Sequence, residues 1–242
     1  MSHTNSNGPI ISIKEVKKSF PVGDGEVTIL KGISFDIGTG EFVSIVGPSG
    51  NGKSTLLNMI TGIDRPSAGE VYVTGQDLNK LSENKMALWR RHNVGIIFQF
   101  FQMLPALTLV ENVMVPMDLA GKYRPKERRE RAMHLLERVG LAEQADKKPN
   151  AVSGGQQQRA GIARAIATDP PLIVGDEPTG RLDPKGAEIC FELFEEWVAE
   201  GKTMLMVTHD KALAERVGRK IQIIDGYVTR DEFIGIGSWA GS

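Results

Sequence analysis

Residues 47–54 read GPSGNGKS, which has the spacing G-x-x-x-x-G-K-[ST] of a phosphate-binding loop. The loop stands between an apolar run, Phe42–Val46, and a helical pattern, Lys53–Ile60, so we expect a strand, a loop and a helix in that order. Glycines let the backbone wrap around phosphate oxygens, which accept hydrogen bonds from amide N–H groups at the positive end of the helix. In such loops the lysine reaches the β- and γ-phosphates, and the next hydroxyl ligates Mg²⁺. The predicted contacts to a nucleoside triphosphate are Gly47, Pro48, Ser49, Gly50, Asn51, Gly52, Lys53, Ser54 and Thr55, with Ser54 on the metal.

Two adjacent acids, Asp176 and Glu177, follow the apolar run Leu172–Gly175. Taken alone, paired acids after a strand are more often a turn or a helix cap. Ligands collect at the carboxyl ends of parallel strands, however, and the phosphate loop favours the functional interpretation. We therefore expect Asp176 to hold Mg²⁺ through water and Glu177 to orient or deprotonate an attacking water.

Residues 152–159 read VSGGQQQR and resemble the LSGGQ signature, followed by QQR, of the ABC ATPases. The resemblance covers nearly the whole chain, from about Ile11 to Val228, with the family's motifs in order. The stretches GPSGNGKSTLLN, FQFFQMLP and DEPTGRLDPKG are most similar to the ATPases of macrolide-export and lipoprotein-release systems. The resemblance implies an ATP-binding and ATP-hydrolysing subunit of an ABC transporter, with ATP and Mg²⁺ as cofactors.

The resemblance also implies a fold. It is an α/β fold with a P-loop NTPase core of the ABC type, an antiparallel β subdomain and a helical subdomain that holds the signature. We expect a single domain over residues 10–230, with the helical subdomain at about 100–167. Residues 1–9 are rich in polar and turn-forming residues and predict a disordered lead-in, and residues 231–242 predict a tail.

In relatives, two subunits meet head to tail around two Mg-ATP. Each nucleotide lies between the phosphate loop of one subunit and the signature of the other, which implies a homodimer here. The signature residues are Ser153, Gly154, Gly155 and Gln156. We expect them to open a helix from about Gln156 to Ala167, whose N-terminal amides suit a γ-phosphate.

Three further roles come from the resemblance alone. Gln99, after the expected strand Val94–Phe98, resembles the glutamine that touches Mg²⁺ and senses the membrane partner. His209 resembles the histidine that contacts the γ-phosphate and helps to hold Glu177 and the water. Phe20 stands where relatives often have a tyrosine stacked on adenine, although packing in the core is an alternative for this residue. The expected catalytic residues are therefore Glu177, His209 and Gln99.

The elements that must position these residues follow from the apolar pattern. Short alternating runs over residues 10–45 predict an antiparallel layer. The continuous apolar runs Leu172–Gly175 and Met204–Val207 predict buried parallel strands, with a helix at 186–200 between them. Apolar residues at helical spacing predict a helix at 128–139, and residues 220–228 predict a closing hairpin.

Composition limits the class of protein and its compartment. The 242 residues include 30 acidic and 29 basic side chains, so the sequence lacks the basic excess of a nucleic-acid binder. One cysteine, Cys190, excludes an internal disulfide and suits a small buried position. No apolar run approaches the roughly 20 residues that span a bilayer, and no signal peptide is recognised. We expect a cytoplasmic subunit on the inner face of the membrane, docked to a separate permease through residues 100–113, part of which is alternatively core of the helical lobe.

Other classes of protein remain as alternatives. A soluble ABC protein of DNA repair or translation normally carries a long inserted coiled coil or two cassettes, and this sequence has neither. A phosphate-loop kinase would lack the signature. A mechanotransmitting ABC ATPase, which signals through a membrane partner without transport, has the same motifs and stays open. Similarity to export and extraction systems favours outward movement of a substrate.

Three residues depart from the family's pattern. Val152 replaces the usual leucine of the signature, Asn51 stands where serine is common, and Arg181 occupies a position that is usually asparagine. The first two substitutions are mild. Arg181 lies in the segment 180–183, which crosses the dimer in relatives, so a bulky cation there is expected to change contacts between the two sites.

We predict that Arg181→Asn leaves ATP binding intact but alters turnover, because the changed side chain lies between the two sites and outside the phosphate loop. Titration calorimetry with ATP and steady-state phosphate release, compared with wild type, measure the two effects separately. Unchanged kinetics in this variant would contradict the prediction.

Overall fold

The computed structural model describes residues 8–100 and 102–234 of the chain. The chain divides into two compact units, one formed by residues 8–86 and 207–234 and the other by residues 87–206. The expected lead-in and tail lie mostly outside the described residues, at 1–7 and 235–242. The expected single domain over residues 10–230, with a helical subdomain at about 100–167, stays a prediction; the second unit contains strands as well as helices.

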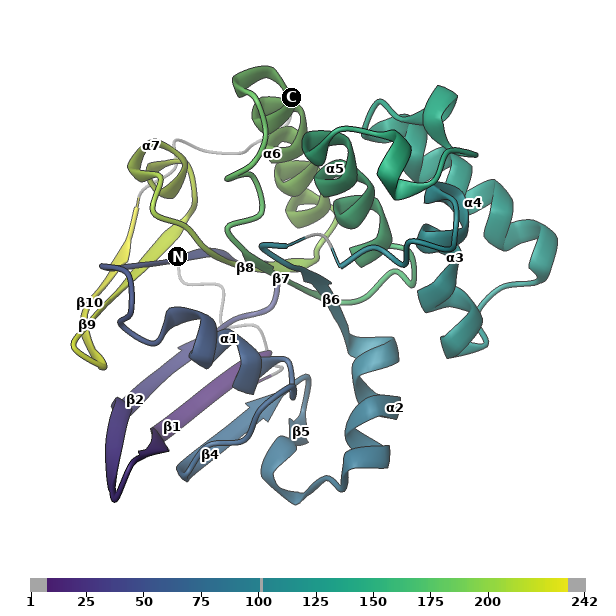
Figure 1. Ribbon diagram of the computed structural model, residues 1–242. Coiled ribbons are helices and arrows are strands. Elements are labelled where there is room, and N and C mark those ends of the chain that lie inside the picture. The colour runs from purple at the N-terminus through teal and green to yellow at the C-terminus, as the bar shows by residue number, and fades with distance from the viewer. Residues whose placement is uncertain (1–7, 101, 235–242) are drawn as a thin grey trace. The chain divides into compact units, whose positions relative to one another are not determined.

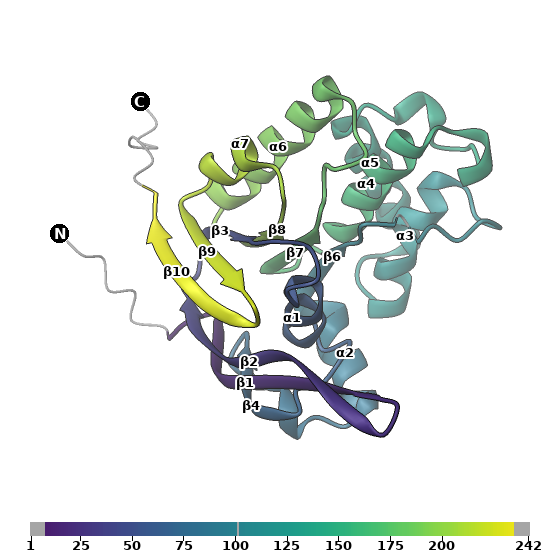
Figure 2. The same cartoon turned by 60° about the vertical axis from the view of Figure 1, so that its left-hand side comes forward.

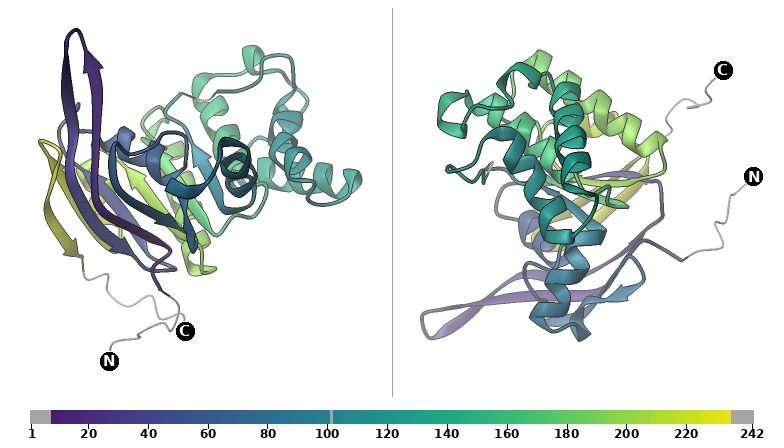
Figure 3. Two further views of the ribbon diagram at one scale, coloured as in Figure 1. Left: turned by 90° about the horizontal axis from the view of Figure 1, so that it is seen from below. Right: turned by 90° about the vertical axis from the view of Figure 1, so that its right-hand side faces the viewer.

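The first unit contains the expected antiparallel layer. Strands β1 (Ile11–Val22), β2 (Gly25–Ile37), β4 (Ala68–Val73) and β5 (Gln76–Asp77) form a sheet in the order β2-β1-β4-β5. Strands β1 and β2 pair antiparallel from Ile11 opposite Ile37 to Val22 opposite Gly25 and extend as a long two-stranded ribbon, purple in Figure 3. Buried and exposed side chains alternate over Ile33, Phe35 and Ile37 of β2, as the sequence pattern predicts, whereas β1 begins with three consecutive buried residues.

The phosphate loop also belongs to this unit and has the expected surroundings. Strand β3 (Phe42–Val46) is followed by the loop and then by α1 (Lys53–Ile60). Beside β3 lies β9 (Arg219–Ile224) in parallel, and β10 (Tyr227–Phe233) pairs antiparallel with β9, as Figure 2 shows in yellow. The unit also holds a 3₁₀ turn at Leu78–Lys80 and α7 (Lys211–Glu215), and the boundary falls within α2 (Glu83–Asn93).

Strand β10 continues to Phe233, three residues beyond the expected end of the domain at residue 230. The reason is a contact between the two strands of the hairpin. The guanidinium of Arg219 binds both carboxylate oxygens of Asp231 at 2.7 Å and lies 4.7 Å from the ring centroid of Phe233. It also donates to Glu41 at 2.9 Å. This largely buried cation extends the strand pairing, a feature that the hydropathy of residues 229–233 does not reveal.

The second unit contains the other expected strands, labelled in Figure 1. Strands β6 (Val94–Ile97) and β7 (Leu172–Asp176) pair in parallel, and β8 (Thr203–Val207) is the other neighbour of β7. Helix α6 (Pro184–Ala199) connects β7 to β8. Strands β7 and β8 are buried almost throughout, as their continuous apolar runs predict.

Three helices pack against one another in this unit: α3 (Leu109–Ala120), α4 (Pro125–Arg138) and α5 (Gly154–Ala165). Short 3₁₀ turns at Ala142–Gln144 and Pro149–Ala151 join α4 to α5. Helix α5 also packs closely on β6, because a Cβ on Gly95 would collide with the carbonyl oxygen of Ala165. This contact explains why the strands and the helical lobe form one compact unit.

Two expectations about single features can be compared with the structure. Cys190 is fully buried, and burial raises the pKa of its thiol to about 12, so the side chain packs as a small apolar group. Over residues 8–100 and 102–234, no helix combines the length and the apolar character needed to cross a membrane.

Replacing Arg219 by leucine should lower the free energy of unfolding by about 2 kcal/mol, between the typical values for exposed and buried ion pairs, because two carboxylates then lose their shared cation. Urea denaturation measures the change. The control is Lys220→Leu at the next position, where the Nζ to Glu232 carboxylate distance is 3.9 Å and little loss is expected. Equal effects of the two substitutions would contradict the structural role of Arg219.

Candidate nucleotide-binding site

Two glycines of the phosphate loop have positive φ angles and lie close to neighbouring strands. Gly47, with φ 151°, faces β9, and a Cβ there would collide with the carbonyl oxygen of Ile223. Gly52, with φ 82°, would place a Cβ 2.6 Å from Cδ2 of Leu30 on β2. Positive φ and lack of space both require glycine. The first unit therefore fixes the path of the loop from two sides.

The arrangement of donors in the loop fits a bound phosphate chain. Lys53 folds back over the loop, and its Nζ donates to the carbonyl oxygens of Gly47 at 2.9 Å and Pro48 at 2.8 Å. Gly52 caps α1 and has no side chain that could satisfy the first amides of the helix. These amides and the ammonium provide positive charge at one place, which is the chemistry that phosphate oxygens require.

Asn51 braces the loop, a role that its type alone does not reveal. Its Nδ2 donates to the carbonyl oxygens of Pro48 and Ser49, each at 3.1 Å, and its Oδ1 accepts from the backbone N–H of Asp225 at 2.5 Å. An amide side chain has two donor hydrogens and one acceptor oxygen, whereas a serine hydroxyl has only one donor hydrogen and a shorter reach. The departure from serine at this position thus ties the loop to the turn between β9 and β10.

Phe20 lies on the surface of the β1–β2 ribbon. It is 38% exposed, and Val27, its partner across the strands, is 45% exposed. The alternative of core packing is therefore wrong for this residue. An exposed aromatic ring beside other apolar side chains is available for stacking with a flat ligand.

His209 is exposed in the first unit and lies two residues after the end of β8. Its neighbours fix the backbone: the N–H of Thr208 donates to the carbonyl oxygen of Ile45 on β3 at 3.3 Å, and the N–H of Asp210 donates to Oγ1 of Thr208 at 3.1 Å. Asp210 then caps α7. The side chain of His209 thus projects from a segment that is attached to the strand preceding the phosphate loop.

In the second unit, the expected polar residues follow two paired strands. The last register pair of β6 and β7 is Ile97 with Gly175; Asp176 comes directly after Gly175, and Gln99 follows Ile97 by two residues. Glu177 has φ 48°, which is uncommon for a residue other than glycine and marks local backbone strain. The carboxyl ends of parallel strands therefore bring Gln99, Asp176 and Glu177 to one edge, as the sequence predicts.

A buried glutamine that the sequence analysis missed bridges the two segments. Gln158, on α5, is 1% exposed, and its Nε2 donates to the carbonyl oxygen of Pro178 at 2.8 Å and to that of Phe98 at 3.4 Å. Its Oε1 has no hydrogen-bond partner among the described residues. In the sequence, Gln158 stands between Gln157 and Arg159 in a polar run, so nothing there indicates that its side chain is buried and makes this link.

The signature forms the start of α5, two residues earlier than expected. Ser153 is the N-cap, and Gly154 opens the helix. A capping box holds the turn: Oγ of Ser153 accepts from the N–H of Gln156 at 3.3 Å, and Oε1 of Gln156 accepts from the N–H of Ser153 at 2.9 Å. A Cβ on Gly155 would lie 3.7 Å from Cδ2 of Leu182, so the signature lies beside the segment 180–183.

Arg181, the third departure, contacts the segment that follows Gln99. Its guanidinium lies 4.5 Å from the ring centroid of Phe100, which is 61% exposed. This is the geometry of a cation–π contact. Arg181 therefore joins the segment after Glu177 to the segment after Gln99 at the surface, while Gln158 joins them inside.

The starts of α1 and α5 lack the acidic residues that are present at the starts of the other α-helices in the described chain. Carboxylates are favoured at helix starts because they compensate the positive end of the helix dipole. Helices α1 and α5 have none at the cap or in the first turn. The other five start with Glu83, Glu111, Glu127, Asp183 or Asp210. The starts of α1 and α5 thus have no carboxylate of their own that compensates the helix dipole.

Comparisons of the chain with family models, known proteins and solved structures agree on one family. A family model described as ABC transporter matches residues 30–180. The lipoprotein-releasing system ATP-binding protein LolD 1 of Chlorobium chlorochromatii is 43% identical over 92% of this chain and 91% of its own length. The chain belongs to the ABC transporter family. A solved structure, the ATP-binding cassette MJ0796 as a dimer bound to ADP and Pi, superposes with a TM-score of 0.90 at 41% identity, over 94% of this chain and all of that one.

Other relatives of this ABC cassette differ in length. The macrolide export ATP-binding/permease protein MacB of a Shewanella species is 45% identical over 93% of this chain, but the chain spans only about a third of that relative, 34% of its length. The uncharacterized ABC transporter ATP-binding protein YvrO of Bacillus subtilis is 44% identical over 92% of this chain and 97% of its own length. The expected family and α/β fold of the ABC ATPase type are confirmed. The roles of the individual site residues stay predictions.

We predict that Asn51→Ala weakens ATP binding by roughly tenfold, since the phosphate loop loses three hydrogen bonds that fix its path. Titration calorimetry in the presence of Mg²⁺ measures the affinity. Asn58→Ala is the matched control, because Asn58 is exposed on α1 and uses only its backbone carbonyl in the described contacts. The bracing role is wrong if both variants bind ATP as wild type does.

Proposed function

We propose that this chain is the ATP-hydrolysing subunit of an ABC transporter that forms a head-to-tail homodimer around two Mg-ATP. In this proposal it drives a separate membrane permease for export or extraction of a substrate. The observation that carries the proposal is the uncompensated positive charge at the starts of α1 and α5, each preceded by the motif expected to bind phosphate. No other helix start of the described chain combines these two features.

In this proposal the loop of the first unit binds the phosphates of ATP. The amides of residues 47–55 bind the oxygens, and Lys53 turns from its carbonyl partners in the loop toward the β- and γ-phosphates. The exposed ring of Phe20 stacks on the adenine. Because the loop is held by β2, β9 and Asn51, it can bind phosphate without a large change in its path.

Ser54, Gln99 and Asp176 would hold Mg²⁺, Asp176 through water. A hydroxyl, an amide oxygen and a carboxylate are oxygen ligands, and hard cations such as Mg²⁺ prefer oxygen. The residues fit such an ion, because Gln99 is exposed and Asp176 is half-buried at the end of β7, so both side chains can reach a ligand. When bound, the ion neutralises negative charge on the phosphates.

Hydrolysis in this proposal is an in-line attack of water on the γ-phosphate. Glu177 accepts the proton of the water, the new P–O bond forms, and the bond between the γ-phosphorus and the bridging oxygen breaks, with ADP as leaving group. His209 contacts the γ-phosphate and keeps Glu177 and the water in place. The strained backbone at Glu177 supports this role, because such strain is commonly retained at catalytic positions.

The signature of the partner copy would complete each site. The start of α5 presents the free amides of Gly154 and Gly155, and the hydroxyl of Ser153 keeps its own proton for donation while it accepts from Gln156. These donors would bind a γ-phosphate. The dimeric form of MJ0796 named above supports a dimer for this chain.

The membrane partner follows from the family and from the names of relatives. Docking to the permease involves the exposed Phe100 and Leu104, whereas Leu109, Val110 and Val113 are fully buried in the helical lobe. The alternative that part of 100–113 is lobe core is therefore right for its second half. We place the subunit on the cytoplasmic face of the membrane, and the names of LolD and MacB support extraction or export.

Glu177→Gln should bind ATP and dimerise in its presence while hydrolysis falls by about 100-fold or more, because an amide cannot take the proton of the attacking water. Light scattering with Mg²⁺ and ATP measures the dimer, and phosphate release measures turnover. Glu143→Gln, at an exposed position of the same unit, is the control and should behave as wild type. A Glu177→Gln variant that stays monomeric while wild type hydrolyses ATP freely would contradict the head-to-tail site.

A further inference from the structure

A lysine lies against the ring of Phe20. The Nζ atom of Lys18 is 4.9 Å from the centroid of that ring, which is within the range of a cation–π contact. Lys18 and Phe20 are two residues apart on β1, and the pairing with β2 shifts register between Lys18 and Ser19. A register shift of this kind changes the direction of nearby side chains. The shift thus lies between the cation and the ring that it contacts.

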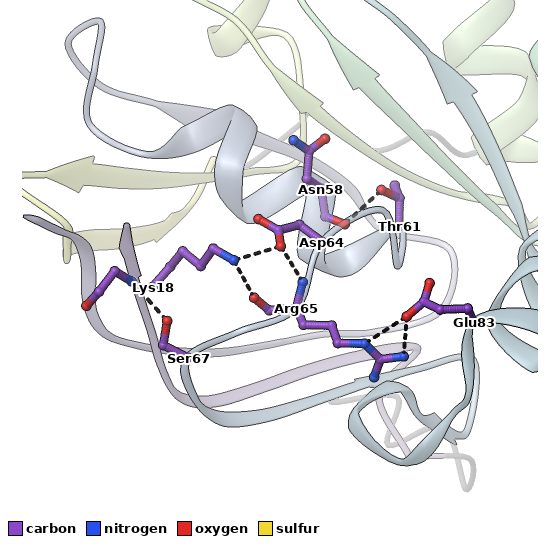
Figure 4. Close-up of polar contacts among 8 residues, drawn as sticks. Lys18, Asn58, Thr61, Asp64, Arg65, Ser67 and Glu83 are labelled. Carbon is purple, nitrogen blue, oxygen red and sulfur yellow. Dashed lines mark hydrogen bonds and ion pairs between the residues drawn. The ribbon is translucent and has the colours of Figure 1, made fainter. Parts of the chain in front are cut away.

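The ammonium of Lys18 is fixed and is not a mobile surface charge. It donates to Oδ1 of Asp64 at 2.7 Å and to the carbonyl oxygen of Arg65 at 2.8 Å (Figure 4). The side chain of Lys18 is only 12% exposed, and that of Asp64 is 33% exposed. Two oxygens and a ring therefore hold this cation in one place, which is uncommon for a long flexible side chain.

The segment that holds Lys18 is itself attached to the helix of the phosphate loop. The N–H of Asp64 donates to the carbonyl oxygen of Asn58 on α1 at 3.1 Å. The guanidinium of Arg65 binds the Glu83 carboxylate at 2.8 Å and the carbonyl oxygen of Leu81 at 2.6 Å, which anchors the segment on its other side. The start of α1 carries the phosphate loop and its end carries the partners of Lys18.

Beside this fixed cation, the ring of Phe20 is still 38% exposed. Val22 and Val27 on the same ribbon are 59% and 45% exposed, so the exposed ring belongs to an apolar surface. A flat heterocycle could bury this surface by stacking on the ring. The side of the ring in contact with Lys18 is not needed for that stacking.

We propose that Lys18 is a positioning residue for the base of the nucleotide: it holds Phe20 in the orientation that stacks on a purine, and Asp64 transmits the position of α1 to this contact. The inference rests on the proposed function, in which Phe20 is the stacking partner. The phosphate loop and the base-stacking ring then belong to one hydrogen-bonded frame within the first unit. The span between the two ends of α1 is about 12 Å for eight residues at 1.5 Å each.

A purely structural ion pair between Lys18 and Asp64 is the alternative. In that case loss of Lys18 loosens the end of α1 and affects the phosphate loop as a whole. Binding of the phosphate chain and of the complete nucleotide would then weaken together. A positioning role affects only the energy contributed by the base, so the two interpretations differ in the ratio of two affinities.

The test is titration calorimetry of the full chain with ATP and with tripolyphosphate, each with Mg²⁺. In Lys18→Met we expect the affinity for ATP to fall by about three- to tenfold, which corresponds to the loss of one cation–π contact. The affinity for tripolyphosphate should stay unchanged. Lys18→Arg should restore ATP affinity, because a guanidinium also stacks on an aromatic ring. Asp64→Asn, which keeps the size of the side chain, should also lower the ratio of the affinity for ATP to the affinity for tripolyphosphate.

Lys14→Met is the matched control, since Lys14 lies on the same strand with its Nζ 5.5 Å from the ring centroid of Tyr72, and it should change neither affinity. The variant Phe20→Leu distinguishes the proposed stacking role of Phe20 from the proposed positioning role of Lys18. If Phe20→Leu leaves the ratio of affinities unchanged, the stacking role of Phe20 and this inference both fail. If Phe20→Leu lowers the ratio but Lys18→Met does not, or if Lys18→Met lowers both affinities equally, only the inference about Lys18 is overturned. Thermal denaturation of each variant checks the fold, and Asp64→Asn serves where Lys18→Met is unstable.

Discussion

The close approach of the phosphate loop to β2 and β9 is the constraint on which the first unit depends. Gly47 has no room for a side chain against the backbone of β9, and Gly52 combines a positive φ with close side chains of β2. At the start of α1, which follows the loop, neither the cap nor the first turn carries a carboxylate that could compensate the amide N–H groups. The loop whose path is fixed in this way thus leads to a helix start with donors for a phosphate.

In the second unit, the polar residues of the site lie on two segments, one after β6 and one at the end of β7. These segments are no longer paired with each other after the last register pair of the two strands. Buried glutamine is costly, and an unpartnered Oε1 adds roughly 1–3 kcal/mol to that cost. Gln158 is nevertheless retained on α5, where both hydrogens of its amide bind carbonyl oxygens of the separating segments. We infer that its donors outweigh its orphaned oxygen, since without them the carbonyl oxygens of Phe98 and Pro178 would each lose a buried donor.

Much of the fold could be predicted from the sequence because its strands are apolar runs and its loop has a fixed spacing. The bounds of β3 and α1 agree with the predicted Phe42–Val46 and Lys53–Ile60. The end of β10 could not be predicted, because it depends on the contact of Arg219 with Asp231 across the two strands of the hairpin. The exposure of Phe20 likewise depends on where the ribbon ends, and an aromatic residue in an alternating strand is equally compatible with the core.

Two residues whose bracing roles sequence reasoning did not predict have a common chemistry. Asn51 in the first unit and Gln158 in the second are both amides that donate to two carbonyl oxygens from loops with no regular hydrogen-bond partners. A motif records which residues touch a ligand, whereas these amides touch the loops that carry those residues. Their function depends on the distances between chain segments far apart in the sequence, so the spacing along one segment cannot reveal it. A side chain with two donor hydrogens at one nitrogen is the smallest neutral group that can hold two such carbonyls together, which is why both units use an amide at this place.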